Sequence, residues 1–358
     1  MRVAIDADLV GKNRSGNETY LRGIIGGLGE LLSGTGHSLI ITGSVREDIA
    51  SITAAGVVAE TLIIPKGIVG DLVLGRLLNS ARASSVLATY NAPLAFTGTI
   101  ATIVHDVSYR RMPDTFPWLL RNRIDLSVRR SIRVSDSIVT ISEFSKQELL
   151  EVYPKLVSDR IVVAGCAANT RFYRRNITAE EMARVKEKYC LPDAFVLAVG
   201  NLQPRKNLGR LVTALQSVDV ELIVVGQAGW LSEGVRTKLK GRVTSLGYVP
   251  DGDLPALYAL ASVFAYPSLY EGFGLPVIEA MAAGTPVITG RIGATAEVAG
   301  HGAILVDPYS LDEIRAGVEK LLGDDEVAAA LIAKGYEQVE RFSWVESARK
   351  LLPSLTGA

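Results

Sequence analysis

The chain lacks the residues on which several classes of protein depend. Its 358 residues include two cysteines and three histidines, so we expect neither a disulfide framework nor a Cys/His zinc site. Lys and Arg together number 38, as do Asp and Glu, and this balance argues against a general nucleic-acid surface. No apolar run approaches the roughly 18 residues of a membrane-spanning helix, and residues 1–10 lack the regions of a signal peptide. We therefore expect a cytoplasmic protein.

Short β-rich runs alternate with helical stretches along most of the chain, which indicates parallel sheets wound on both sides. One series of runs precedes residue 166 and a second follows residue 194, with a charged, helical segment between them. The sequence thus predicts two Rossmann-like, doubly wound parallel-sheet domains facing a central cleft, with ligands at the carboxyl ends of the strands. The predicted parts are an N-terminal domain over 1–170, a C-terminal domain over 171–340 and a final helix over 341–358.

The segment SLYEGFGLPVIEAMAAGTP, residues 268–286, carries the most specific pattern. Glu271 and Glu279 bracket a turn, after which Pro276 suits the first position of a helix and Gly284 ends it. The turn consists of Gly272, Phe273, Gly274 and Leu275. Unpaired N–H groups at such a helix start form an anion site, most naturally for phosphate. A sugar nucleotide fits, because its hydroxyls can separate the phosphates from the two carboxylates.

This segment resembles the Glu-x7-Glu signature of the family-4 retaining glycosyltransferases of GT-B fold, which move a sugar from a nucleotide donor. The alternative is an ordinary β-turn-α unit. The resemblance is strongest over residues 195–307. It implies that Glu271 holds donor-sugar hydroxyls, that Glu279 holds the ribose diol, and that the final helix packs on the N-terminal domain. Similarity to the mannosyltransferase-like group makes GDP-mannose the first expected donor, before UDP-glucose or a UDP-N-acetylhexosamine, with a glycan or lipid-linked acceptor.

Two cations follow the run AFVLAVG. Arg205 and Lys206 lie at the expected carboxyl end of a strand, where they can reach the loop of Glu271. Fixed cations there would stabilise the charge of a departing nucleoside diphosphate. The alternative is a solvated pair before a helix. Because the segment resembles the PRKN segment of the same family, we interpret both as catalytic residues.

The loop of Tyr248 and Val249 is expected to contact the nucleotide base, as the family resemblance implies. Asp251 and Asp253, which follow it, match an Asp-x-Asp pattern that holds a divalent metal in another glycosyltransferase class. We interpret these carboxylates as caps of the next helix. The similar pair at residues 6–8 is interpreted as a strand-end turn. The expected enzyme is therefore metal-independent and needs no cofactor besides its donor.

In the first domain, His105 and Asp106 end a strand, and the segment resembles the family's HDV segment. The resemblance implies a contact with the transferred sugar, and we do not interpret His105 as a general base. Gly11 and Gly16 match the family's glycine-rich loop near the donor phosphates. No dinucleotide-binding fingerprint is present after the first strand. Ser142 is predicted to cap a helix.

Arginines are concentrated between residues 110 and 133, with aromatic and aliphatic residues among them. They are Arg110, Arg111, Arg121, Arg123, Arg129, Arg130 and Arg133. Two interpretations remain open. One is a solvated helix face; the other is a surface for anionic lipid or a phosphorylated acceptor.

Three other functions compete with this interpretation of the sequence. A sugar-nucleotide 2-epimerase shares the fold, but the further acid/base residues of that class are not evident among three histidines. A nicotinamide oxidoreductase is disfavoured by the missing glycine fingerprint. A non-catalytic sugar-nucleotide-binding protein would need neither Arg205 nor Lys206.

Overall fold

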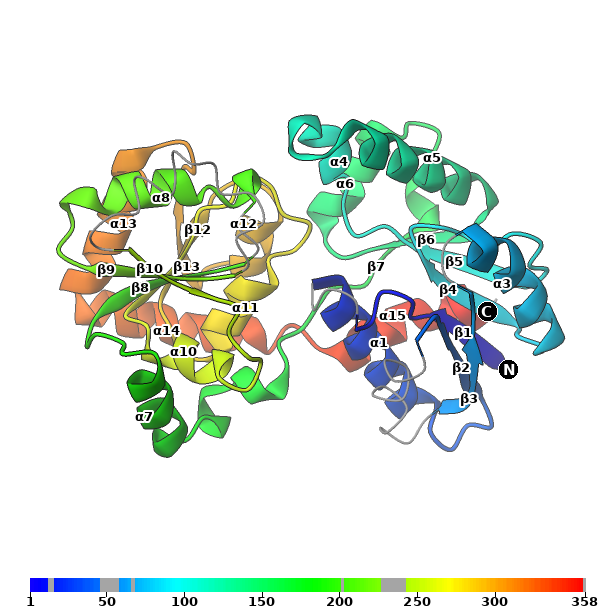
Figure 1. Ribbon diagram of the computed structural model, residues 1–358, viewed down its shortest axis with the longest axis horizontal. Coiled ribbons are helices and arrows are strands. Elements are labelled where there is room, and N and C mark those ends of the chain that lie inside the picture. The colour runs from blue at the N-terminus through cyan, green and yellow to red at the C-terminus, as the bar shows by residue number, and fades with distance from the viewer. Residues whose placement is uncertain (12–15, 46–57, 66–67, 201–202, 227–242, 357–358) are drawn as a thin grey trace. The chain divides into compact units, whose positions relative to one another are not determined.

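The protein consists of two compact units, which are described separately. The computed structural model describes residues 1–11, 16–45, 58–65, 68–200, 203–226 and 243–356 (Figure 1). Unit 1 comprises Met1–Cys166 with Ser343–Ala358, and unit 2 comprises Ala167–Phe342. None of the helices in the described ranges is long and apolar enough to cross a bilayer.

Unit 1 is built on a seven-stranded sheet with the order β3-β2-β1-β4-β5-β6-β7. Its strands are β1 Arg2–Asp6, β2 Ser38–Gly43, β3 Val58–Ile63, β4 Ser85–Thr89, β5 Thr99–Ile103, β6 Ser137–Thr140 and β7 Ile161–Val163. All neighbours are parallel, and Ile5 of β1 pairs with Ile41 on one side and Leu87 on the other. Six of these strands were predicted. The edge strand β7 was not, because three residues are too short to show a period.

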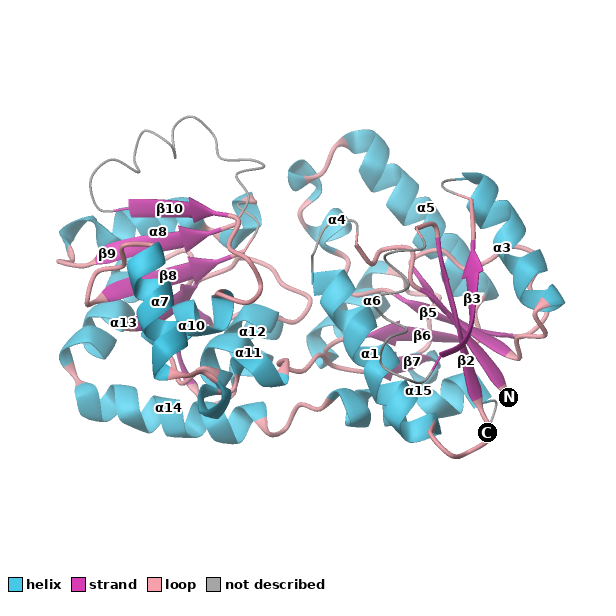
Figure 2. Ribbon diagram, turned by 60° about the horizontal axis from the view of Figure 1, so that its bottom comes forward, coloured by secondary structure: helices cyan, strands magenta, loops and turns pink. Residues whose placement is uncertain are grey.

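Helices lie on both sides of this sheet (Figure 2). They are α1 Gly16–Leu32, α3 Ile68–Ser80, α4 Ser108–Arg111, α5 Trp118–Val134, α6 Glu143–Val152 and α15 Trp344–Thr356, with 3₁₀ turns η1 Pro113–Thr115 and η2 Ser158–Arg160. Ser142 caps α6, as predicted, by accepting a hydrogen bond from the Ser145 N–H at 3.0 Å. The C-terminal α15 packs along α1 and contacts β4, β5 and β7. The Ser347 hydroxyl donates to the Gly165 carbonyl at 2.7 Å.

Unit 2 holds a six-stranded parallel sheet with the order β10-β9-β8-β11-β12-β13. Its strands are β8 Phe195–Val199, β9 Glu221–Val225, β10 Val243–Gly247, β11 Val263–Tyr266, β12 Val287–Gly290 and β13 Ala303–Val306. The helices are α7 Ala179–Lys188, α8 Leu208–Ala214, α10 Leu254–Leu260, α11 Leu275–Ala282, α12 Ala294–Ala299, α13 Leu311–Gly323 and α14 Asp325–Val339, with 3₁₀ turns η3 Thr170–Phe172, η4 Arg174–Asn176, η5 Pro204–Lys206 and η6 Leu215–Ser217. All six strands were predicted. Both units confirm the predicted class of two doubly wound parallel-sheet domains.

The order of the second sheet determines where ligands can bind. The chain leaves β8 toward β9 and β10, then returns to place β11 on the other side of β8. The loops after β8 and β11 therefore diverge at a topological switch point, where open α/β sheets bind their ligands. Side chains of α8 and α13 share one core cluster with β8, β9 and β11, which fixes both strands beneath this point.

Candidate active site

The loops after β8 and β11 are joined at their backbones. The Leu269 N–H donates to the Arg205 carbonyl at 2.8 Å. Asn207 has a left-handed backbone (φ +60°), a conformation that asparagine tolerates better than most residues. Its buried side-chain amide donates to the carbonyls of Pro267 and Pro308 at 3.0 and 2.5 Å. The switch point is thus a rigid platform.

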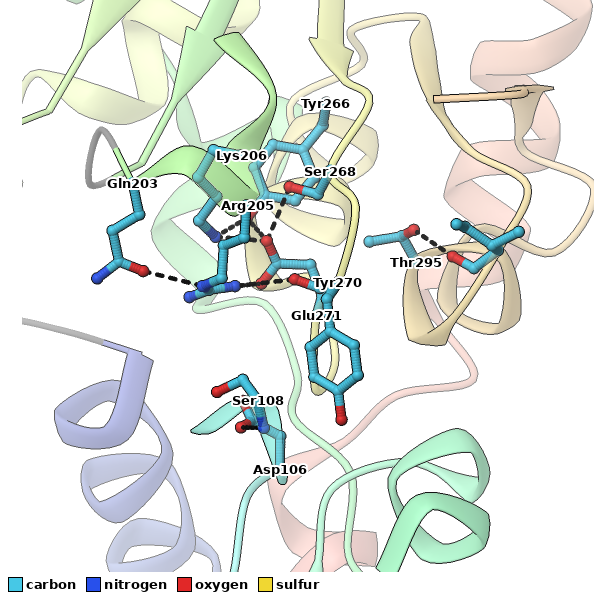
Figure 3. A network of polar contacts seen from close by, with 11 residues as sticks. Asp106, Ser108, Gln203, Arg205, Lys206, Tyr266, Ser268, Tyr270, Glu271 and Thr295 are labelled. Atoms are coloured by element: carbon cyan, nitrogen blue, oxygen red, sulfur yellow. Dashed lines mark hydrogen bonds and ion pairs between the residues drawn. The ribbon is translucent and has the colours of Figure 1, made fainter. Parts of the chain in front are cut away.

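The Glu271 carboxylate binds both Arg205 and Lys206 on this platform (Figure 3). Its Oε2 accepts from Nη1 of Arg205 at 2.7 Å, and its Oε1 accepts from Nζ of Lys206 at 2.6 Å. Oε1 also accepts from the hydroxyls of Ser268 at 2.8 Å and Tyr266 at 3.1 Å. The residues that the sequence predicted as neighbours are therefore in direct contact, and the carboxylate orients both cations.

The negative charge of the buried Glu271 carboxylate is compensated by the two cations that contact it. Burial alone would raise the pKa of Glu271, but Arg205 and Lys206 outweigh it and lower the pKa to about 2. Glu271 is 7% exposed, and the side chains of its partners are 18% and 14% exposed. The low exposure strengthens each interaction relative to a surface ion pair. The site holds an ionised carboxylate between two cations at neutral pH.

Helix α11 begins after the predicted turn. Its first residue is Leu275 and Pro276 is the second, so the predicted start was one residue late. Gly274 needs its glycine, because it has φ +103° and a Cβ there would lie 3.0 Å from the Thr295 side chain. At the other end Gly284 has φ +77° and terminates the helix, as predicted.

Glu279 lies on the second turn of α11 in different surroundings. The Tyr258 hydroxyl donates to its Oε2 at 3.1 Å. Burial raises the pKa of Glu279 to about 7, although the Tyr258 hydrogen bond and the charge of Arg171 oppose the rise. The Asp251 charge also raises this pKa. The two glutamates of the Glu-x7-Glu pattern therefore differ in protonation.

The loop between β10 and α10 lacks the helix cap that the sequence predicted. Tyr248 is 44% exposed and Val249 is buried, so Tyr248 presents an accessible ring. Asp253 occupies the N-cap position of α10, but its side chain makes no capping hydrogen bond. Instead it pairs with Arg184 at 2.7 Å and Lys188 at 2.6 Å. The predicted cap was wrong because these two cations of α7 compete for the same carboxylate.

The remaining turn residues are packed inward. Phe273 is buried, and its ring meets that of Phe342 edge-on with centroids 5.4 Å apart. Gly272 is also buried. Both residues fix the path of the chain from Glu271 into α11, so the helix start is held in place.

In unit 1, His105 and Asp106 follow β5. His105 is 3% exposed, and its Nε2 has no hydrogen-bond partner among the described residues. Burial lowers the pKa of His105 to about 4, although the Asp106 charge opposes this, so the ring is neutral at neutral pH. The Asp106 carboxylate accepts from the Ser108 N–H at 2.8 Å (Figure 3). A neutral imidazole offers one donor and one acceptor to a polar ligand.

The glycines of the first loop lie on either side of residues outside the described ranges. Gly11 has φ +79°, which favours glycine, and Gly16 is the first residue of α1. Residues 12–15 of the predicted glycine-rich loop are not among those described.

Four residues of the platform were not predicted. Tyr266 and Ser268 bind Glu271, Asn207 ties the loops together, and the Gln203 side chain accepts from Nε of Arg205 at 2.9 Å. Asn207 directly follows Lys206, and its tolerance of left-handed backbone was the available signal. The signal for Tyr266 and Ser268 was weaker, because it consisted only of their position at the end of a buried run.

Known proteins share this arrangement of sequence and fold. Residues 181–338 match the family model described as "Glycosyl transferases group 1". O-antigen chain mannosyltransferase B of Escherichia coli is 35% identical over 255 residues, which cover 68% of this chain and 66% of that protein. Serotype-specific mannosyltransferase WbdA of Escherichia coli is 32% identical over 62% of this chain and 29% of its own length. The chain thus spans less than two thirds of both curated relatives.

Other relatives align over almost the whole chain. A GDP-mannose-dependent alpha-(1-6)-phosphatidylinositol monomannoside mannosyltransferase of Mycobacterium tuberculosis is 28% identical over 96% of this chain and 95% of its own. Among solved structures, HepE of Anabaena in complex with UDP and glucose covers 100% of both chains with TM-score 0.78 and 17% identity. A glycosyltransferase of Rickettsia africae covers 99% of this chain and 98% of its own with TM-score 0.76 and 20% identity. At such identities the likeness to solved structures shows the fold alone.

Proposed function

We propose that this chain, which has the GT-B fold and a group 1 glycosyl transferase domain at residues 181–338, transfers a hexose from a nucleotide sugar to an acceptor hydroxyl, with retention at the anomeric carbon. The first donor proposed is GDP-mannose, in line with mannosyltransferase relatives at 28–35% identity. The acceptor proposed is a glycan or a lipid-linked glycan. The observation that carries the proposal is Glu271, which holds two cations at the switch point.

The donor diphosphate is proposed to bind between these cations and the start of α11. Arg205 and Lys206 supply positive charge, and the first N–H groups of a helix lack intrahelical acceptors and carry the positive end of its dipole. Among the described residues, Oε2 of Glu271 accepts only from Arg205, so it can still accept one sugar hydroxyl. Glu271 would therefore position the cations and bind the sugar. Glu279, once ionised, would accept the ribose hydroxyls.

The proposed chemistry is dominated by leaving-group stabilisation. The bond between the anomeric carbon and the β-phosphate oxygen breaks while the acceptor oxygen bonds to that carbon from the same face. The acceptor proton passes to the released phosphate. Negative charge grows on the phosphate, and the preoriented Arg205 and Lys206 stabilise it without rearranging. Glu271 is an unsuitable nucleophile, because its carboxylate is already engaged by both cations.

In this proposal His105 binds the transferred sugar as a neutral imidazole. Its lowered pKa makes proton abstraction near neutral pH unfavourable, since a general base works best with a pKa near the working pH. Its Nε2, which has no hydrogen-bond partner in the part of the chain that the structure describes, is the atom that would meet a sugar hydroxyl. Gly11 and Gly16 would let the backbone approach the phosphates, while Tyr248 and Val249 would contact the base.

Metal independence is also proposed. The Asp253 carboxylate of the Asp-x-Asp pattern is held by Arg184, Lys188 and the Tyr189 hydroxyl, so a metal would have to displace three donors. Arg205 and Lys206 would supply the charge that a divalent metal supplies in other transferases. No cofactor besides the donor is expected.

Substitution of Lys206 tests the proposed function. A charge-assisted hydrogen bond is worth about 1.5–3 kcal/mol, so Lys206→Ala is expected to lower the rate of nucleoside diphosphate release by roughly 10- to 100-fold. The assay uses GDP-mannose, UDP-glucose and a UDP-N-acetylhexosamine, each with and without acceptor. Lys320→Ala removes an exposed lysine of α13 and serves as the matched control. Unchanged release in both Lys206→Ala and Glu271→Ala would refute the proposal.

A further inference from the structure

The outer face of α5 exposes large apolar side chains. Trp118 is 65% exposed, Leu119 is 75% exposed and Leu126 is 71% exposed. The adjacent Leu120 and Val134 are 46% and 43% exposed. Single exposed leucines are common on protein surfaces, but a group of them on one helix indicates an interaction site.

Two of these side chains, Leu119 and Leu126, share one stripe of the helix with arginines. Leu119, Arg123, Leu126 and Arg133 are spaced at i, i+4, i+7 and i+14, which places them on the same side of a helix. The buried residues Val128, Ser131 and Ile132 occupy the opposite side. The helix is therefore amphipathic in an unusual way, because its solvent face carries both leucines and cations.

The inner side of α5 is firmly attached to the rest of unit 1. Asp125 accepts from the Tyr153 hydroxyl at 2.8 Å and from Nε of Arg129 at 2.8 Å. The Tyr109 and Tyr153 hydroxyls are hydrogen-bonded at 2.7 Å. Arg130, which follows Leu119 by 11 residues and so lies on the side of the stripe, is also fixed, because its Nη1 donates to the Ala92 carbonyl at 2.5 Å. These contacts hold the helix still, so its outer residues form a preset surface.

The charge on this surface is not neutralised from within. Helix α5 contains five arginines and one acidic residue, Asp125, which Arg129 and Arg110 pair with on the inner side. Four of the five make no ion pair with any residue in the described ranges, namely Arg121, Arg123, Arg130 and Arg133. Arg130 instead donates hydrogen bonds to the carbonyls of Ala92 and Pro93. Arg123 and Arg133 lie on the stripe with Leu119 and Leu126 and leave a positive field there, whereas Arg121, two residues after Leu119, lies on the other side of the helix.

We infer that the outer face of α5 is a docking surface for the anionic lipid headgroups of a membrane. The occupant must offer negative charge and, just below it, an apolar medium for Leu119 and Leu126, and a bilayer interface provides both at that depth. Trp118 suits the same boundary, because its ring is apolar and its N–H is polar. An acidic protein would neutralise the charge of the arginines but would leave the leucines without an apolar partner. The inference is independent of the donor chemistry, since it concerns only α5.

Vesicle sedimentation of the full chain tests this inference. The protein is expected to bind vesicles of phosphatidylcholine with phosphatidylglycerol, and to bind pure phosphatidylcholine at least tenfold more weakly. Each arginine near an anionic surface contributes a factor of about five, so the double substitution R123Q/R133Q should weaken binding by roughly 25-fold. L119S/L126S should weaken it by about tenfold or more. On binding, the Trp118 fluorescence should shift to shorter wavelength, with Trp118→Phe identifying that signal.

Two substitutions outside α5 serve as controls for the vesicle experiment. Val157 is 55% exposed and the Arg349 side chain 58% exposed outside α5, so V157S and R349Q should bind vesicles as the wild type does. Circular dichroism and donor binding of the α5 variants should match those of the wild type. The inference is overturned if anionic and neutral vesicles bind equally, if L119S/L126S binds as tightly as the wild type, or if lipid-free sedimentation shows that α5 joins two copies of the chain.

Discussion

At the residue scale, the two glutamates of one motif have opposite electrostatic surroundings. Glu271 lies between Arg205 and Lys206, which lower its pKa to about 2. Glu279, eight positions later, accepts a hydrogen bond from the Tyr258 hydroxyl, and burial raises its pKa to about 7. When the surroundings of two carboxyl groups give them different pKa values, the two groups commonly have different roles. Here the ionised group would hold cations and the other would respond to pH and ligand.

The pKa of Glu279 predicts how donor binding depends on pH. Its carboxyl group is largely protonated at pH 6 and ionised at pH 8, and the ionised form accepts ribose hydroxyls better. GDP-mannose affinity should therefore rise, by up to about tenfold, as the pH increases through about 7. Titration calorimetry from about pH 5.5 to 8.5 measures this. A nucleotide sugar is preferable to a free diphosphate, because its phosphates do not titrate in that range.

Two variants separate this effect from others. Glu279→Gln should bind more weakly and lose the pH dependence. Tyr258→Phe removes the hydrogen bond that lowers the pKa of Glu279, so the midpoint should move to higher pH. A pH profile that Glu279→Gln leaves intact would show that another group titrates.

At the element scale, a pair of glycines determines how α15 packs on α1. A Cβ on Gly23 would lie 2.2 Å from the Trp344 ring, and a Cβ on Gly27 would lie 2.4 Å from the Trp344 carbonyl oxygen. Both positions require glycine so that the two helices can approach. Gly26, on the same helix, has nothing within 4 Å of a Cβ. The family resemblance implied that the final helix packs on the first domain, but the sequence could not show which glycines admit it.

This difference gives a matched stability test. Gly23→Ala overpacks the helix junction and should lower the free energy of unfolding by about 1–3 kcal/mol. Gly26→Ala should raise it by about 0.5–1 kcal/mol, because alanine is the better helix former. Urea unfolding of both variants checks the signs. Equal effects of the two substitutions would mean that α15 does not pack here.

A second element-scale prediction concerns α7. Burial would raise the pKa of Asp253, but hydrogen bonds from Lys188, Arg184 and Tyr189 lower it to about 2. A carboxyl group whose folded pKa is depressed contributes stability above its unfolded pKa, near 3.8, and loses it as the pH falls toward 2. Asp253→Asn should cost about 1–2 kcal/mol at pH 7, less than the shift alone suggests because its cationic partners are half-exposed.

Thermal unfolding as a function of pH measures this contribution. The gap in stability between the wild type and Asp253→Asn should be widest near pH 7, should be about halved near pH 3 and should close only as the pH falls to about 2 and below. The exposed Asp312 on α13 gives a control, since Asp312→Asn loses only a surface pair with Arg315. A gap that persists at low pH would contradict the ion-pair account of α7.

At the scale of the whole molecule, the sequence predicted the two sheets and the contact among Glu271, Arg205 and Lys206. The carboxyl ends of parallel strands lie at the same edge of a sheet. Residues that directly follow two adjacent strands are therefore close together, whatever their separation in sequence. The partners of Asp253 could not be predicted in this way. They come from α7, and whether Arg184 and Lys188 reach one carboxylate depends on helix packing that periodicity does not specify.

The proposed metal independence predicts a result for the intact enzyme. Because Arg205 and Lys206 would supply the charge at the leaving group, excess EDTA should leave transfer unchanged, and added Mg²⁺ or Mn²⁺ should raise it less than about twofold. Initial rates of nucleoside diphosphate release measure this. Loss of activity in EDTA with recovery on adding Mg²⁺ would refute metal independence, and Asp251 would then be the first residue to test as a ligand.

The central claim is that the loops after β8 and β11 bind a nucleoside diphosphate, and a thermal-shift titration tests it most directly. GDP at about 100 times its Kd should stabilise the wild type by about 2.7 kcal/mol. The shift should be lost in Lys206→Ala and retained in Lys320→Ala. If no nucleoside diphosphate raises the Tm of the wild type, or if Lys206→Ala responds as the wild type does, the claim is contradicted.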